Sequence, residues 1–145
     1  MGRLALIIVI AVLGLIPIVT GLMEVFLGPA FAPGGEAVNP SLDSEWRYAH
    51  TFWLAAGVLL WWSLFAPEKR ASVTRVLLII AALGGLARLV SVIWVGWPHP
   101  VFIASLVLEV VVLPFVIWWH WRAFPPRDTA KPGESGESGP PQSPA

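Results

Sequence analysis

Four long apolar runs divide this chain, and they lie at about residues 4–26, 48–65, 73–97 and 101–121. A helix of about 20 apolar residues spans the hydrocarbon core of a bilayer. Since 57% of the 145 residues are hydrophobic and only 12% are charged, the composition argues against an ordinary water-soluble domain. We therefore expect an all-α membrane protein, a bundle of four transmembrane helices within the lipid bilayer.

The first connection, Leu27–Glu45, is rich in glycine and proline, which predicts a structured loop rather than a regular helix. Its last residues resemble a helix start, with Ser41 or Asp43 as alternative N-caps. The first run could instead be a signal peptide cleaved after Ala30–Ala32. It is too long for one, however, and Pro33 would follow the cleavage site. A spanning helix is the better interpretation.

Charge sets the expected orientation of the four helices. Positively charged flanks of transmembrane helices stay in the cytoplasm. In a four-span topology the basic residues near the connections, apart from Arg47 beside the first loop, fall on one side, and they are Arg3, Lys69, Arg70, Arg75, Arg122, Arg127 and Lys131. Both termini are therefore expected to be cytoplasmic, and the first loop is expected to be an outer loop.

The end of the chain differs from the rest in composition. Residues 122–145 consist largely of Pro, Gly, Ser and charged residues, with almost nothing apolar. Such a segment cannot bury enough apolar surface to fold. The sequence therefore predicts a transmembrane domain of residues 1–121, followed by a disordered cytoplasmic tail.

Two residues of opposite charge lie deep inside the third and fourth runs. Arg88 lies nine residues before Trp97, and Glu109 lies eight residues after Val101. At about 1.5 Å per residue, both lie about 12 to 14 Å below the same membrane face. An unpaired charge at such a depth costs about 2.5 to 3.5 kcal/mol. The sequence therefore predicts an intramembrane ion pair.

Other polar side chains of the runs gather in the same outer half of the predicted bundle. With the ion pair, the candidate site comprises Glu24, Glu45, Arg47, His50, Arg88, Ser91 and Glu109. The Arg88–Glu109 pair is either a structural clasp or part of a pocket that binds a ligand or transfers a proton. Glu24, Glu45 and Arg47 could instead reach the head groups and water as interfacial charges.

The sequence offers no support for metal or cofactor chemistry. Its three histidines lie at different predicted depths, and cysteine is absent. It contains no phosphate loop, nucleophile elbow or dinucleotide fingerprint. The few scattered basic residues give no footprint for nucleic acid. We assign no metal, no cofactor, no nucleic-acid partner and no catalytic residue.

Several separated motifs together resemble a small bacterial family of four-helix integral membrane proteins that is catalogued only as a domain of unknown function. In chain order these motifs are Leu15-Ile16-Pro17 with Thr20-Gly21, Leu27-Gly28-Pro29, Asn39 to Arg47, Gly84 to Arg88, Gly96-Trp97-Pro98, and Glu109 with Pro114. The resemblance covers about Leu4 to Trp121. It implies the four-helix fold and a place in the bacterial inner membrane. It also implies that the family pattern includes Glu45, Arg47, Arg88 and Glu109, and it implies no activity.

Three functions are compatible with these features. The favoured one is a non-enzymatic protein that binds a small amphiphile or a partner subunit through an outer-facing polar pocket. The alternative is a membrane enzyme acting on a lipid or isoprenoid, with Glu109 or Glu24 as general acid or base and Arg88 setting its pKa. An oligomeric transporter subunit ranks last, because four spans without an internal repeat are few for a monomeric carrier.

Overall fold

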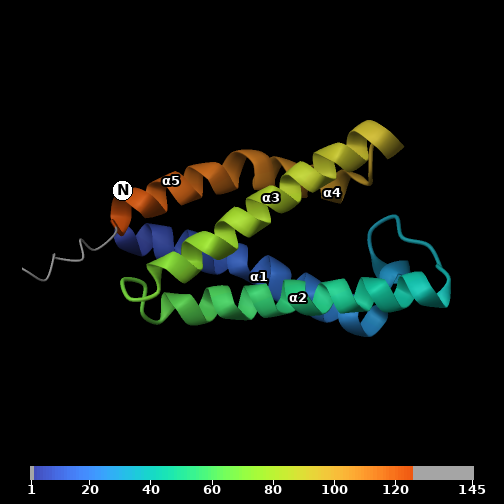
Figure 1. Ribbon diagram of the computed structural model, residues 1–145, viewed down its shortest axis with the longest axis horizontal. Helices are drawn as coiled ribbons and strands as arrows, with labels where there is room; N and C mark the ends of the chain where they lie inside the picture. Colours follow the sequence, from blue (N-terminus) through green and yellow to red (C-terminus); the bar gives the residue numbers. More distant parts are fainter. Residues whose placement is uncertain (1, 126–145) are drawn as a thin grey trace, which may run out of the picture.

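The computed structural model describes residues 2–125, and all regular secondary structure in this range is helical (Figure 1). The elements are α1 (Arg3–Leu27), the short 3₁₀ helix η1 (Pro29–Phe31), α2 (Pro40–Leu64), α3 (Ala71–Val95), α4 (Pro100–Val107), the π-helical segment η2 (Leu108–Val112) and α5 (Leu113–Ala123). The predicted disordered tail lies, from residue 126 onward, outside the described residues. Its first two residues belong to α5, which continues to Ala123.

Three stretches of the described chain are helices long and apolar enough to cross a membrane, namely α1, α3 and the continuous stretch Pro100–Ala123. Many of their large apolar side chains are exposed, including Val12, Ile80 and Ile93. Water covers such faces poorly and lipid covers them well, so this pattern is typical of a membrane protein.

The predicted run at residues 48–65 falls in α2, which has 25 residues, as many as α1 and α3. Polar residues in its first half, among them Arg47, His50 and Thr51, make it less apolar than the other three. A fourth span therefore stays a prediction.

The structure corrects the predicted start of the second helix. The N-cap is Asn39, whose side chain accepts a hydrogen bond of 3.0 Å from the backbone N–H of Leu42. It is neither Ser41 nor Asp43. Pro40 occupies the first helical position, which suits proline because the N–H it lacks would have no partner there.

The fourth apolar run is interrupted by a π-turn. The backbone N–H of Leu113 donates to the carbonyl of Leu108, five residues back rather than four. Pro114 follows directly, and because it has no N–H it cannot donate to the carbonyl of Val110. Prolines and π-turns both distort helices. The distortion here falls on η2, the segment that carries Glu109.

The helices form two hairpins (Figure 1). In the first, α1 and α2 run antiparallel and pack closely, because glycines face the partner helix. A Cβ on Gly21 would lie 2.8 Å from the backbone nitrogen of Leu54, and one on Gly57 would lie 2.8 Å from the side chain of Ile18. In the second, α3 packs against η2, α4 and α5. Small residues allow this approach between helices in a membrane.

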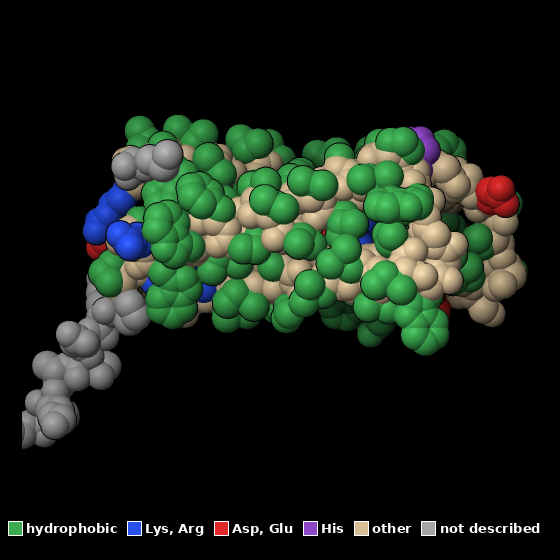
Figure 2. Space-filling model, turned by 90° about the horizontal axis from the view of Figure 1, so that it is seen from above, with side chains coloured by type: hydrophobic (Ala, Val, Ile, Leu, Met, Phe, Trp, Pro, Cys, Tyr) green, Lys and Arg blue, Asp and Glu red, His purple; other side chains and the backbone are tan. Residues whose placement is uncertain are grey.

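The apolar core lies toward the end of the molecule that holds the N-terminus, the α2–α3 connection and the end of α5 (Figure 1). Its buried members are Leu6, Ile10, Leu60, Leu78, Leu113, Val116 and Phe124. Figure 2 shows apolar side chains along the whole molecule and basic side chains gathered at this core end. The rest of the space between the hairpins, toward the opposite end, is less completely filled.

Candidate functional site

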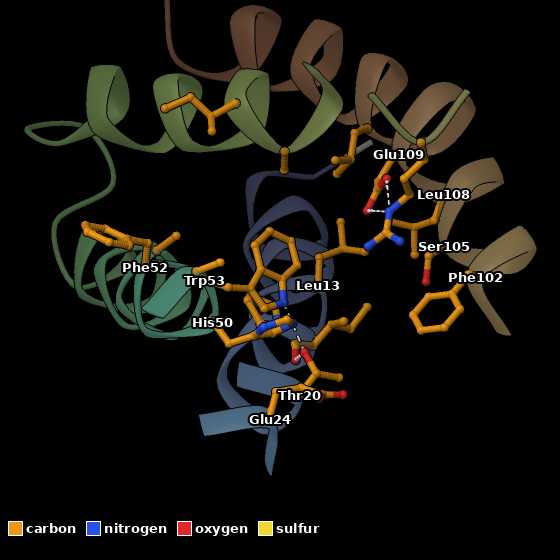
Figure 3. Close-up of a pocket in the computed structure, with 18 of the residues that line it drawn as sticks. Leu13, Thr20, Glu24, His50, Phe52, Trp53, Phe102, Ser105, Leu108 and Glu109 are labelled. Atoms are coloured by element: carbon orange, nitrogen blue, oxygen red, sulfur yellow. Dashed lines mark hydrogen bonds and ion pairs between the residues drawn. The ribbon is translucent and has the colours of Figure 1, made fainter. Parts of the chain in front are cut away.

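A cavity of about 540 Å³ lies between the two hairpins (Figure 3). Residues of α1 and α2 form one wall, and residues of α3, α4 and η2 form the other. Most of the lining is apolar. The polar side chains among it are Thr20, Glu24, Trp46, His50, Trp53, Arg88, Ser105 and Glu109. An apolar cavity of this size with a few convergent polar groups is typical of a small-molecule site.

Arg88 and Glu109 meet at the second wall. Nε of Arg88 donates to both carboxylate oxygens of Glu109, at 2.9 and 3.2 Å, and Figure 3 marks these contacts with dashed lines. The Glu109 side chain is 7% exposed, whereas that of Arg88 is 40% exposed. No described residue accepts a hydrogen bond from either terminal nitrogen of Arg88. Nη1 and Nη2 are therefore available to the cavity.

A glycine on α3 lets the ion pair form. A Cβ on Gly85 would lie 2.7 Å from the Cβ of Glu109 and 3.1 Å from the Cγ2 of Val110, closer than real side chains come. The neighbouring Gly84 has nothing within 4 Å of such a Cβ. Gly85 therefore permits η2 to pack directly against α3. Glu109 lies against Gly85, which is about one helical turn before Arg88 on α3.

Two indoles organise the opposite wall. Trp46 Nε1 donates to Glu24 Oε2 at 2.7 Å, and Trp53 Nε1 donates to Thr20 Oγ1 at 3.0 Å. In Figure 3, Thr20, Glu24, His50 and Trp53 lie on the side of the cavity away from Glu109 and Ser105. Each indole thus fixes a polar side chain of α1 at the cavity wall.

His50 presents a defined ring face to the same wall. Its ring stacks on Trp46, with centroids 4.7 Å apart, and its Nδ1 lies 2.8 Å from the Trp46 carbonyl oxygen. Because a carbonyl oxygen can only accept, Nδ1 donates to it, and in the neutral tautomer that this bond selects Nε2 is an acceptor. This wall therefore offers acceptors, while the wall of Arg88 offers donors.

The sequence-predicted site residues divide into two groups. Those that line the cavity are Glu24, His50, Arg88 and Glu109. Glu45 and Ser91 are exposed and lie outside the lining. Arg47 also lies outside it and has a different role.

Arg47 ties the start of α2 to the end of α1. Its guanidinium pairs with Asp43 at 2.7 and 3.1 Å and donates to the carbonyls of Val25 at 2.8 Å and Phe26 at 3.1 Å. The last carbonyls of a helix have no donor within it. The pKa of the Asp43 carboxyl lies below its ordinary value, because the Arg47 guanidinium hydrogen-bonds to it. Arg47 is thus a link between helices rather than part of the cavity.

A second buried polar cluster, at the core end, is absent from the sequence-based site. Arg75 is 8% exposed, its Nε lies 3.3 Å from His120 Nδ1, and its guanidinium donates to the Phe124 carbonyl and lies over the Trp121 ring. From the sequence, Arg75 is expected only as a cytoplasmic flank of the third run. Its place inside the predicted run 73–97 was the available signal that it is buried.

The carboxylates of the cavity are partly engaged by partners within the protein. Both oxygens of Glu109 are engaged by Arg88, and one oxygen of Glu24 is engaged by Trp46. Among the described residues, no group of three or more His, Asp or Glu side chains is placed to hold a metal ion. The groups left with hydrogen-bonding capacity face each other across the cavity.

The comparisons with known proteins place the chain in a family. Residues 5–120 match the family described as "Domain of unknown function (DUF4345)". No curated protein and no solved structure gives a significant match. Because the match extends over most of its length, the chain belongs to this family.

Proposed function

We propose that this protein is a non-enzymatic, four-span protein of the bacterial inner membrane that binds a small amphiphile in the cavity between its hairpins. The observation that carries the proposal is the lining itself, in which mostly apolar walls enclose Arg88, Glu109, Glu24 and His50. Apolar walls suit a hydrocarbon chain, and the polar groups suit a head group. A small molecule matches better than a partner subunit, because these groups line a cavity rather than an exposed face.

The proposed topology includes α2 as the fourth span. Its length and its close packing along α1 support this placement, because two packed antiparallel helices of equal length cover the same depth. The basic residues at the core end support cytoplasmic termini. Reporter fusions after Ala123 and within the first loop test the topology. An outside location for the fusion after Ala123 would contradict it.

Native mass spectrometry tests the binding. Protein released gently from the membrane should retain a lipid-sized molecule, and filling the cavity should remove it. Ala56 lines the cavity, whereas Ala55 is exposed and does not. Ala56→Phe should therefore lose the molecule, and the matched control Ala55→Phe should keep it. Repeated recovery of an empty wild-type chain, or equal retention by both variants, would overturn the proposal.

A further inference from the structure

We infer that the head group of the bound amphiphile carries a single negative charge, held by Arg88, and an O–H or N–H donor, held by Glu24 and His50. This inference rests on the proposed function and names the ligand class. It follows from how the hydrogen-bonding capacity is distributed between the two walls of the cavity.

Arg88 supplies the anion subsite. Its contact with Glu109 runs through Nε, so Nη1 and Nη2 keep their donors. A guanidinium presents its donors in a planar fork that matches a carboxylate or a phosphate. The same contact with buried Glu109 fixes the plane of the guanidinium, while the Arg88 side chain as a whole stays 40% exposed. Glu109 is thus a positioning residue for Arg88.

The aromatic ring of Phe102 flanks this subsite. The Cζ of Arg88 lies 5.5 Å from the ring centroid, and Phe102 itself lines the cavity. A cation at this distance from an aromatic ring is attracted by the ring. Phe102 thus helps to hold the guanidinium at the cavity.

Glu24 limits the charge of the ligand. It is the third charged side chain of the lining and has the same sign as the expected head group. Glu24 repels a head group with two negative charges more strongly than one with a single charge, and a singly charged head group bound to Arg88 can turn a donor toward Glu24. Trp46 occupies only Oε2 of Glu24, and no described residue donates to Oε1 or to Nε2 of His50.

Five soluble amphiphiles test the inference against the full chain in a neutral maltoside detergent. Dihexanoylphosphatidylglycerol and 3-hydroxydecanoate carry one negative charge and a hydroxyl donor. Dihexanoylphosphatidylmethanol and decanoate carry the charge without the donor, and dihexanoylglycerol carries the donor without the charge. Their Kd values are measured by isothermal titration calorimetry, with Ala56→Phe as the blocked cavity.

The charged probes with a donor should bind at least about tenfold more tightly than their donor-free partners and than dihexanoylglycerol, the size of effect that a hydrogen bond to a charged group produces. A larger preference for the donor in the two phosphatidyl probes indicates a phosphodiester head group, and a larger preference in the two decanoates indicates a carboxylate. Either result supports the inference.

Two variants locate the effect. Arg88→Lys keeps a cation for Glu109 but has no fork, so it should lose most of the preference for the charged probes over dihexanoylglycerol. Glu24→Gln should reduce the preference for a donor without reducing the preference for charge. Circular dichroism checks that both variants keep their helices.

The outcomes separate this inference from the proposed function. If all five probes bind alike, and Ala56→Phe blocks them all, the cavity binds amphiphiles but the inference about the head group is wrong. It is also wrong if Arg88→Lys retains the full preference for charge. If no probe binds and native protein is empty, the proposed function fails as well.

Discussion

Removing one partner of the Arg88–Glu109 pair should cost more stability than removing the other. The Glu109 side chain is 7% exposed, whereas that of Arg88 is 40% exposed and borders the cavity. Arg88→Leu therefore leaves a buried carboxylate without its cation, whereas Glu109→Leu leaves a guanidinium that can still be hydrated. We expect Arg88→Leu to be the more damaging change.

The size of the difference follows from proton uptake. Without Arg88 the carboxylate can be neutralised by a proton, which at pH 7 costs about 1.4 kcal/mol for each unit above the ordinary carboxyl pKa of about 4.3, or about 3.7 kcal/mol. This value is an upper limit for the penalty of the buried charge alone, because the carboxylate protonates before a larger penalty arises. Glu109→Leu should cost about 1 kcal/mol, as for a partly solvated ion pair. The double variant should cost less than Arg88→Leu, because no charge remains buried.

Equilibrium unfolding in mixed micelles, followed by tryptophan fluorescence, measures these free energies. The loss in Arg88→Leu should shrink by about 1.4 kcal/mol for each unit that the pH falls from 7 toward 5. The loss in Glu109→Leu should stay constant over the same range. Equal losses for the two single variants, or a pH-independent loss in Arg88→Leu, would refute this reasoning.

Two further predictions concern the packing around the site and the loop. Gly85→Ala should cost about 1 to 3 kcal/mol in the same unfolding assay, because its Cβ would clash with Glu109, whereas Gly84→Ala should be neutral or slightly stabilising. The link through Asp43 should weaken as the pH falls through the lowered pKa of its carboxyl, since a depressed pKa gives stability that is present above the ordinary value and is lost in acid. The protection of the first loop against hydrogen exchange, corrected for the pH dependence of the intrinsic rate, should therefore fall below about pH 4 in the wild type. It should already be low at pH 7 in Arg47→Leu, and unchanged protection in that variant would contradict the link.

Counting residues from the turn at Pro98–Pro100 was enough to place Arg88 and Glu109 at similar depth, and their side chains do meet. Depth along a helix depends only on a constant rise per residue. Rotation about the helix axis is harder to predict, because a π-turn adds a residue without leaving a periodic signal. For this reason the position of Glu109 along the helix could be predicted from the sequence, but the π-helical segment η2 that carries it could not.

The partners of two arginines lie far along the chain and could not be read from the sequence. Arg47 was a candidate for the polar pocket or an interfacial charge, and the carbonyls of Val25 and Phe26 bind it at the end of α1. Arg75 was expected as a cytoplasmic flank, and His120 and the other groups near the end of α5 surround it. A side chain as long as arginine can choose among acceptors several ångströms apart, and only the packed structure specifies which acceptor is within reach.

The cavity itself was predicted in outline only. The sequence placed its polar residues in one half of the molecule. It assigned neither Trp46 nor Trp53 to the cavity wall. Trp46 lies near the end of a predicted span, where a tryptophan usually indicates an aromatic belt. Their hydrogen bonds to Glu24 and Thr20 depend on how α1 and α2 face each other.

The π-turn η2 also acts as a phase shift between two halves of one helix. An additional residue rotates everything after it by about 100° relative to a regular helix. The half before it presents Phe102 and Ser105 to the cavity, and the half after it presents Leu113 and Val116 to the core. Substitutions in one half should therefore leave the orientation of the other half unchanged, provided that the number of residues in η2 is kept. Deleting a single residue from η2 would rotate one half of the helix away from the helices that it packs against, even though every side chain outside η2 would be unchanged.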